Sequence, residues 1–245
     1  MNPRLTIATA SRVVMQLRND PRTIALLLLT PVLLITLMKW IYLDQDRVFK
    51  RIGVPLLGIF PLTSMFLVTS ITMLRERTTG TLERLLTTPL ARLDLLLGYA
   101  LAFGAVAVVQ ASLVSVVAFG LLGLSVHGPV LAIVALAVVN ALLGTAMGLL
   151  VSAFANSEFQ AVQFMPVFLL PQLLLCGLVA PRDTMARGLE LFSDALPMTY
   201  AYDALSRVAA GDGLTTRVAG DTAFLAIASL LALGLGAATL RRRTA

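Results

Sequence analysis

Few residues in this 245-residue chain have side chains that could do chemistry, and those present favour binding over catalysis. Cys176 and His127 are the one cysteine and the one histidine, so the sequence excludes a zinc site built from three or four such ligands. A phosphate-binding P-loop requires a lysine directly after a glycine, and neither Lys39 nor Lys50 follows one. We therefore expect no metal site and no catalytic residues, and ATP would have to be bound by another polypeptide.

Four amide side chains lie inside long apolar stretches. Proton-coupled carriers and intramembrane proteases place Asp, Glu or His at this depth, and the apolar stretches here contain none. An amide forms hydrogen bonds between helices or with a bound compound, but it cannot relay protons. We expect these residues mainly to pack helices and treat them as candidates for lining a translocation path: Gln110, Asn140, Gln163 and Gln172.

The polar segment 75–90 is the most informative part of the chain. Gly80 precedes a leucine-rich run and Glu83 follows three residues later, which is typical of a helix start. A helix of about two turns is too short to be stable alone in water. Its apolar face would dock into a groove on a partner or rest on the membrane surface. The residues expected to form this face and then to end the helix are Leu82, Leu85, Leu86 and Pro89.

The elements that must position these residues are membrane-spanning helices. Hydrophobic residues make up 58% of the chain, charged residues 13%, and the mean hydropathy is +0.89, which excludes a soluble or disordered domain. A helix needs roughly 20 apolar residues to cross the hydrocarbon core of a bilayer. Six stretches meet this requirement: 24–41, 52–74, 95–124, 129–154, 161–180 and 222–240.

The charged residues predict the orientation of the chain. The net charge of +6 is scattered between apolar runs without a basic stripe, which argues against a nucleic-acid partner. Residues 1–23 are predicted to form an interfacial helix, because Arg4, Ser11 and Arg18 fall on one face. Arginines close to span ends favour a cytoplasmic location for both termini, at position 22 and in segments 75–92 and 241–243.

Several segments together resemble one family of membrane proteins. Glu76, Gly80-Thr81-Leu82-Glu83, Leu85-Leu86 and Thr88-Pro89-Leu90 resemble the cytoplasmic loop of type-two ABC exporter permeases, a group that includes daunorubicin-type drug exporters. Segment 18–22 is similar to the family's entry into its first span. Segment 176–181, with Gly177 and Pro181, is similar to the end of its fifth span, although the family often has serine where this chain has Cys176. The motif before the last span is also similar, with Pro197, Tyr200, Asp203 and Gly211.

The resemblance implies an all-α membrane protein with six transmembrane helices per subunit. It further implies an N-terminal interfacial helix in 1–23, a cytoplasmic coupling helix in 75–90 and short outer-leaflet helices in 181–220, for which an ordinary extracellular loop is the alternative. Two permease subunits, identical or different, would form the pore and bind separate ATP-binding subunits that hold ATP and Mg²⁺. The residues implied in coupling to the ATPase are Glu76, Gly80, Thr81, Leu82, Glu83, Leu85 and Pro89.

The prediction that follows is a permease subunit that exports a hydrophobic or amphipathic compound, such as a drug, lipid or glycolipid, across the cell membrane. The chain itself would hydrolyse nothing. Two other classes of protein remain as alternatives. A polytopic lipid-modifying enzyme would cluster polar catalytic residues at membrane depth, and the absence of acidic residues there counts against it. The other alternative is a membrane scaffold subunit that transports nothing.

Overall fold

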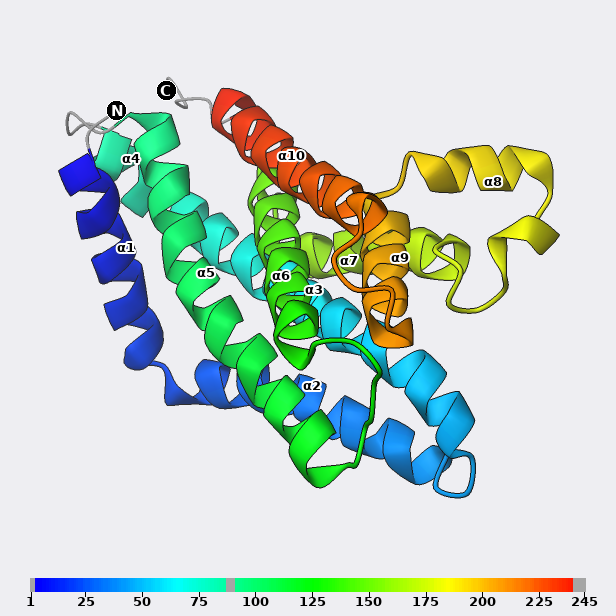
Figure 1. Cartoon of the computed structure of the whole chain (residues 1–245). Helices are drawn as coiled ribbons and strands as arrows, with labels where there is room; N and C mark the ends of the chain where they lie inside the picture. Colours follow the sequence, from blue (N-terminus) through cyan, green and yellow to red (C-terminus); the bar gives the residue numbers. More distant parts are fainter. Residues whose placement is uncertain (1–2, 87–90, 240–245) are drawn as a thin grey trace.

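The computed structural model describes residues 3–86 and 91–239, apart from the side chains of Glu83, Leu85 and Leu86. This part of the chain folds into helices without strands (Figure 1). In chain order the elements are α1 (Pro3–Arg18), α2 (Pro21–Ile41), α3 (Asp46–Thr78), α4 (Thr81–Leu86), α5 (Arg92–Val116), the π-helical turn η1 (Val117–Leu121), α6 (Val130–Ser152), α7 (Glu158–Leu175), the 3₁₀ turn η2 (Arg182–Thr184), α8 (Arg187–Asp194), α9 (Pro197–Ala210) and α10 (Thr216–Thr239).

Six helices in the described ranges are long and apolar enough to cross a membrane, namely α2, α3, α5 with η1, α6, α7 and α10. The predicted all-α membrane fold with six spans is confirmed. Several predicted boundaries were wrong, because apolar composition marks the part of a helix that lies in lipid and not where the helix ends. α3 continues at both ends through charged residues, and α10 begins at Thr216 instead of residue 222. α7 ends five residues early, at Leu175, before Gly177 adopts a φ of 103°.

The N-terminal region forms a helix that is shorter than the predicted 1–23. α1 ends at Arg18, and Asp20 begins α2 by accepting hydrogen bonds from the Thr23 hydroxyl at 2.6 Å and the Thr23 backbone N–H at 3.2 Å. These hydrogen bonds hold the pKa of Asp20 below its ordinary value. α1 packs against α5 through its buried face, which includes Val13 and Leu17, while the opposite face is exposed.

The centre of the bundle is the contact between α3 and α6. Gly144 and Gly148 lie one turn apart on α6 and face the backbone carbonyls of Leu62 and Phe66 on α3. A Cβ atom at either glycine would overlap these carbonyls, so the absence of a side chain allows the two helices to approach closely. The helices α2, α7 and α10 lie around this pair and keep most of their apolar surface exposed.

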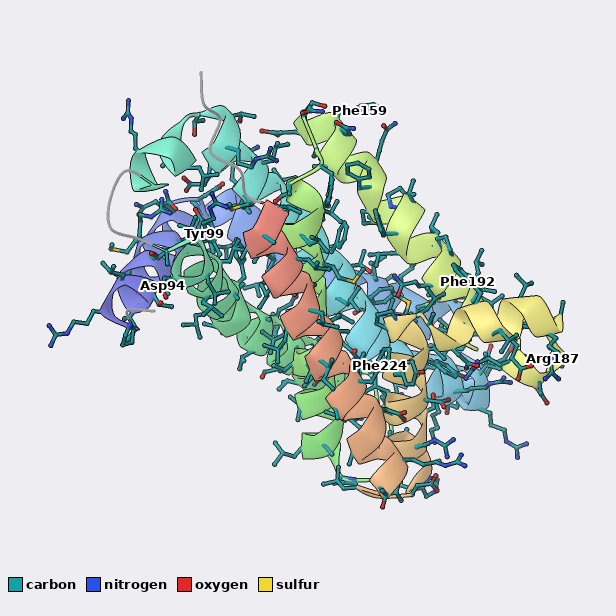
Figure 2. The ribbon with its side chains drawn as sticks, turned by 90° about the horizontal axis from the view of Figure 1, so that it is seen from above. Asp94, Tyr99, Phe159, Arg187, Phe192 and Phe224 are labelled. Carbon is teal, nitrogen blue, oxygen red and sulfur yellow. The ribbon has the colours of Figure 1, made fainter. Side chains whose placement is uncertain are left out.

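In Figure 1 α4, the start of α1 and the end of α10 all lie toward the upper end of the bundle. We call this region the α4 end. α8 projects from the other side of the bundle, where α9 packs against α10. Figure 2 shows the same separation from above, with Tyr99 next to α1 and with Arg187 and Phe192 on α8 at the far side.

Candidate interaction site around α4

A glycine turn connects α3 to α4. Thr79 ends α3, since its backbone N–H donates to the Arg75 carbonyl at 2.9 Å. Gly80 then adopts a φ of 72°, a left-handed conformation that side-chain-bearing residues rarely take, although there is open space around it. α4 begins at the next residue, and the Gly80 carbonyl accepts a hydrogen bond from the Arg84 N–H at 3.2 Å. Gly80 therefore occupies the predicted helix-start position and sets the direction of α4.

Leu82 does not lie where the sequence suggested. It was predicted on an outward docking face, but it is only 5% exposed and belongs to the buried cluster that includes Val13 and Leu17 of α1. The side chains of Glu83 and Leu85, and Pro89 as a whole, lie outside the described residues.

Glu76, in the last turn of α3, is a buried carboxylate bonded to α1. Arg12 donates from Nη1 to Glu76 Oε1 at 2.9 Å and from Nη2 to the Tyr99 hydroxyl at 2.8 Å, so one guanidinium joins α1, α3 and α5. Burial acts most strongly on the pKa of Arg12 and lowers it, but Tyr99 and Glu76 outweigh burial and raise the pKa overall. Arg12 therefore stays charged. Glu76 Oε2 is buried and forms no hydrogen bond with Arg12, while the Tyr99 hydroxyl, which accepts from Arg12, also lies near the Glu76 carboxylate.

The residues on either side of Glu76 bond to two further elements. Arg75 forms a bidentate pair with Glu158 at the start of α7, with Nε to Oε1 at 2.7 Å and Nη2 to Oε2 at 3.1 Å. Arg77 donates from Nη1 to the carbonyls of Ser152 and Ala155 at the end of α6, where a cation also suits the helix dipole. Three successive residues at the end of α3 thus bond to α1, to α7 and to carbonyls at the end of α6 and just beyond it, and Arg12 extends the network to Tyr99 of α5. Gly80 and α4 follow three residues later.

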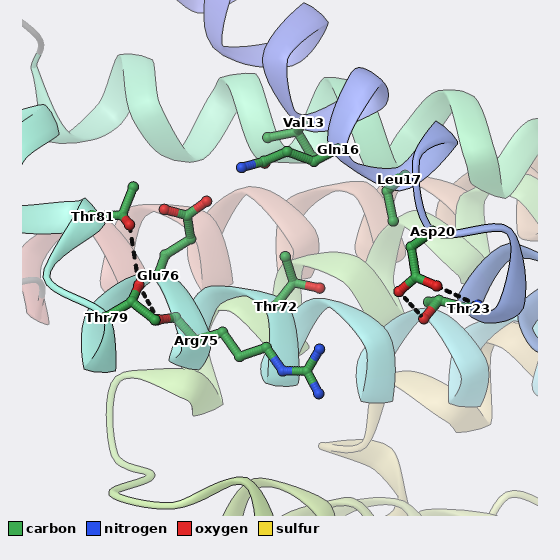
Figure 3. Close-up of a pocket in the computed structure, with 10 residues that line it drawn as sticks. All are labelled: Val13, Gln16, Leu17, Asp20, Thr23, Thr72, Arg75, Glu76, Thr79 and Thr81. Atoms are coloured by element: carbon green, nitrogen blue, oxygen red, sulfur yellow. Dashed lines mark hydrogen bonds between the residues drawn. The ribbon is translucent and has the colours of Figure 1, made fainter.

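A cavity of about 290 Å³ opens beside these residues, between α1 and α3. Figure 3 shows the Glu76 carboxylate facing the space between Thr81 and Gln16, with the Arg75 guanidinium directed away from it. The lining is mostly polar and consists of Val13, Gln16, Leu17, Asp20, Thr23, Thr72, Arg75, Glu76, Thr79 and Thr81.

The four candidate amides are not brought together, since no hydrogen bond joins any two of them. Gln110 Nε2 donates to the Leu27 carbonyl at 2.6 Å and thereby links α5 to α2. Gln172 Nε2 donates to the Phe168 carbonyl at 2.9 Å, and its Oε1 accepts from the Met198 N–H at 3.3 Å. Gln163 is exposed. Asn140 is fully buried in α6 without a partner for either amide atom, which is unusual for a native core.

Four of the five residues of the predicted outer motif lie on α9 or against it. A Cβ on Gly177 would lie 3.0 Å from the ring of Tyr202. Pro197 is the first residue of α9, and Tyr200 donates from its hydroxyl to the Asp194 carbonyl at 2.7 Å. The Tyr200 ring stacks on Phe224 of α10, with ring centroids 3.9 Å apart. The remaining motif residues are Pro181, which precedes η2, and Asp203, which forms an ion pair at 3.8 Å with Arg207 one turn further along α9.

Sequence reasoning selected Glu76 but missed the residues that bond to the end of α3. Arg12, Tyr99 and Glu158 come from three separate segments, and nothing local identifies them as partners. One signal was available, because the run Arg75-Glu76-Arg77 places alternating charges at the end of a long apolar helix. Such charges need partners if any of them is buried.

The fold and these contacts define a multi-pass α-helical membrane protein with a short helix outside its spans, held to the bundle through α1 and the end of α3. The chain belongs to the ABC-2 type transporter family, whose model matches residues 4–209.

Named relatives agree with this family. The chain is 28% identical over 161 residues to the probable multidrug ABC transporter permease YbhR of Escherichia coli, a match that covers 65% of the chain and 44% of the relative. It is 25% identical over 178 residues to YbhS of the same organism, covering 72% of the chain and 47% of the relative. It is also 25% identical over 177 residues to the linearmycin resistance permease protein LnrN of Bacillus subtilis, covering 69% and 44%. The matched region thus spans slightly less than half the length of each of these relatives.

Proposed function

We propose that this chain is the membrane-spanning permease subunit of an ATP-driven exporter that moves a hydrophobic or amphipathic compound out of the cell. The observation that carries the proposal is the position of α4. It follows a left-handed glycine turn, and the preceding turn of α3 bonds to α1, α6 and α7, with Arg12 of α1 bonding in turn to Tyr99 of α5. A force applied to α4 would reach most of the bundle through those bonds.

The family and the names of the relatives support this function over the alternatives. Two of the relatives are named as probable multidrug permeases and a third as a linearmycin resistance permease. We therefore infer that the transported compound is drug-like or lipid-like. A lipid-modifying enzyme or a scaffold without transport finds no support in this family.

ATP and Mg²⁺ would be bound by a separate ATP-binding subunit that docks on α4, and ATP-driven closure of that subunit would bias the permease between two states. In this mechanism Gly80 and Thr81 set the direction of the coupling helix, with Glu83 at its start and Pro89 at its stop. Leu85 would contact the partner. Leu82 would anchor α4 to the core, a revision that follows from its burial.

The same proposal places the chain in the cell membrane with both termini in the cytoplasm, paired with a second permease subunit. The common location of α4, the start of α1 and the end of α10 supports a shared side for the termini (Figure 1). The exposed apolar faces of α2, α7 and α10 are available for lipid or for the second subunit.

The test is transport by the purified complex. The chain is co-expressed with its ATP-binding subunit and reconstituted in vesicles, and ATP-dependent uptake of a fluorescent amphipathic dye is measured. Gly80→Val is expected to lower uptake at least about tenfold with little loss of folded protein, because valine resists the left-handed turn. Gly220→Val is the matched control, since Gly220 lies in α10 with open space around it. Failure of the wild-type chain to retain an ATP-binding subunit would contradict the proposed function.

A further inference from the structure

We propose that the cavity between α1 and α3 receives a lysine or arginine side chain of the ATP-binding subunit, whose cationic group bonds to Glu76 Oε2. This inference rests on the proposed function, because it requires a partner that docks beside α4. It adds a specific binding site, and a chemical class of side chain, to a docking surface that otherwise consists of a short helix.

The first argument is the unpaired oxygen. The Glu76 side chain is 8% exposed, and Arg12 bonds only to Oε1. Oε2 is buried without a hydrogen-bond partner, although Glu76 lines a polar cavity. A carboxylate oxygen withdrawn from water and left unpaired is costly, so the site favours a ligand that donates hydrogen bonds.

The second argument is charge. Asp20 and Glu76 contribute two negative charges to the cavity, and Arg12 offsets one of them. Arg75 also lines the cavity, but its guanidinium is paired with Glu158 and is directed away from Glu76 (Figure 3). The net charge left over is negative, and Thr72, Thr79 and Thr81 add polar side chains to the lining of the cavity. The cavity therefore suits a cationic donor and disfavours a phosphate or another anion.

The third argument is access. Gln16, Arg75 and Thr79 line the cavity and are exposed, so the cavity is reached from outside the bundle. Gly80 and α4 follow Thr79 directly. A subunit that contacts α4 would thus have its surface next to the opening, and a long flexible lysine or arginine side chain could extend to the buried carboxylate.

The test compares two variants that break the same ion pair from opposite sides. Glu76→Gln keeps the shape of the side chain but removes the proposed acceptor charge. Arg12→Gln leaves that charge in place, and Val13 and Leu17 still hold α1 against the core. We expect Glu76→Gln to raise the Kd for the ATP-binding subunit about tenfold or more, and Arg12→Gln not to raise it. Both variants should lower the melting temperature, so lost stability cannot explain a difference in affinity.

A third variant, Thr72→Met, fills the cavity from the α3 wall and leaves the Arg12–Glu76 pair intact. It is expected to weaken binding as Glu76→Gln does. Affinity is measured by titrating the ATP-binding subunit onto the detergent-solubilised chain. Equal weakening by Glu76→Gln and Arg12→Gln would show that Glu76 acts only by holding α1, and normal binding by both Glu76→Gln and Thr72→Met would show that the cavity stays empty. Either result overturns this inference alone. A wild-type chain that binds no ATP-binding subunit overturns the proposed function as well.

Discussion

Two regions of α3, its last turn and its middle, are held in place by different physical means. In the last turn, Arg75, Glu76 and Arg77 each bond to a different neighbouring element through charged groups. In the middle, α3 touches α6 through glycine and backbone atoms, with few polar bonds. An exposed ion pair is worth at most about 1 kcal/mol, whereas overpacking a close helix contact costs about 1–3 kcal/mol.

The difference indicates which part of the bundle is free to rearrange. Exposed ion pairs can exchange partners at small cost, while the contact between α3 and α6 tolerates little displacement. We infer that α3 and α6 move together and that changes of state occur where the exposed Arg75–Glu158 pair joins α3 to α7, since the Arg12–Glu76 pair to α1 is largely buried. Substitutions at the α3–α6 contact should therefore mainly lower stability, whereas substitutions at the exposed ion pair should mainly affect transport.

The largest effect is expected at the α3–α6 contact. Gly144→Ala and Gly148→Ala should each lower the free energy of unfolding by about 2–3 kcal/mol, because the new Cβ would overlap carbonyls of α3. Gly234→Ala in α10 is the control and should be neutral or slightly stabilising, since open space surrounds that helical position. Unfolding in detergent, followed by intrinsic fluorescence, measures all three. Similar stability for Gly144→Ala and Gly234→Ala would mean that the helices are less closely packed than described.

Smaller changes in stability are expected when two buried amides in the middle of the bundle are replaced. The two changes should have opposite signs. Asn140→Leu should stabilise the fold by about 1 kcal/mol, because two unpaired polar atoms are removed from the core. Gln110→Leu should destabilise it by about 1 kcal/mol, because the hydrogen bond to the Leu27 carbonyl is lost. The same unfolding assay compares them. A loss of stability in Asn140→Leu would indicate that this amide has a partner, such as a buried water.

Loss of transport in a stabilised Asn140→Leu variant would assign Asn140 to the translocation path, as the sequence suggested. Dye uptake by reconstituted vesicles gives this second readout. Unchanged uptake together with higher stability would instead remove Asn140 from the candidate path.

The smallest effect on stability is expected for the exposed pair between α3 and α7. Glu158→Arg should cost about 0.5 kcal/mol, because both side chains are more than half exposed. Its effect on transport should be larger, since the bond joins the end of α3 to α7. The exchanged pair Arg75→Glu with Glu158→Arg should restore uptake. Equal uptake in the single and the exchanged variants would exclude this pair from any path between α4 and α7.

The sequence predicted the spans well because hydrophobic length is a local property. It predicted helix ends poorly, since the charged residues at both ends of α3 continue the helix outside its apolar part. At the candidate site, Gly80 was selected from local spacing and Glu76 from the resemblance to the family's cytoplasmic loop. The burial of Leu82 could not be predicted in this way, because an apolar face in a sequence does not specify what covers it. Leu82 lies in the buried cluster that also contains Val13 and Leu17.

The hydrogen-bond partners that different helices provide for one another could not be predicted from the sequence either. Arg12 and Tyr99 are far apart in the chain and meet Glu76 only because α1 packs against α5. The missing hydrogen-bond partner of Glu76 Oε2 likewise depends on how α1, α3 and α5 pack together, which the sequence does not show.

The short loop before α6 bears on how the protein is made. His127 donates its backbone N–H to the Ala209 carbonyl at 3.1 Å, and Gly128 lies so close to Val208 that a Cβ would overlap the Val208 carbonyl. These contacts join the loop to the end of α9, which the ribosome synthesises only after α6, α7 and α8. The loop can therefore form these contacts only after α9 has been synthesised. This side of the bundle can therefore assemble only after residue 209 has been synthesised, and a bulky residue at position 128 is expected to prevent the loop from packing against α9.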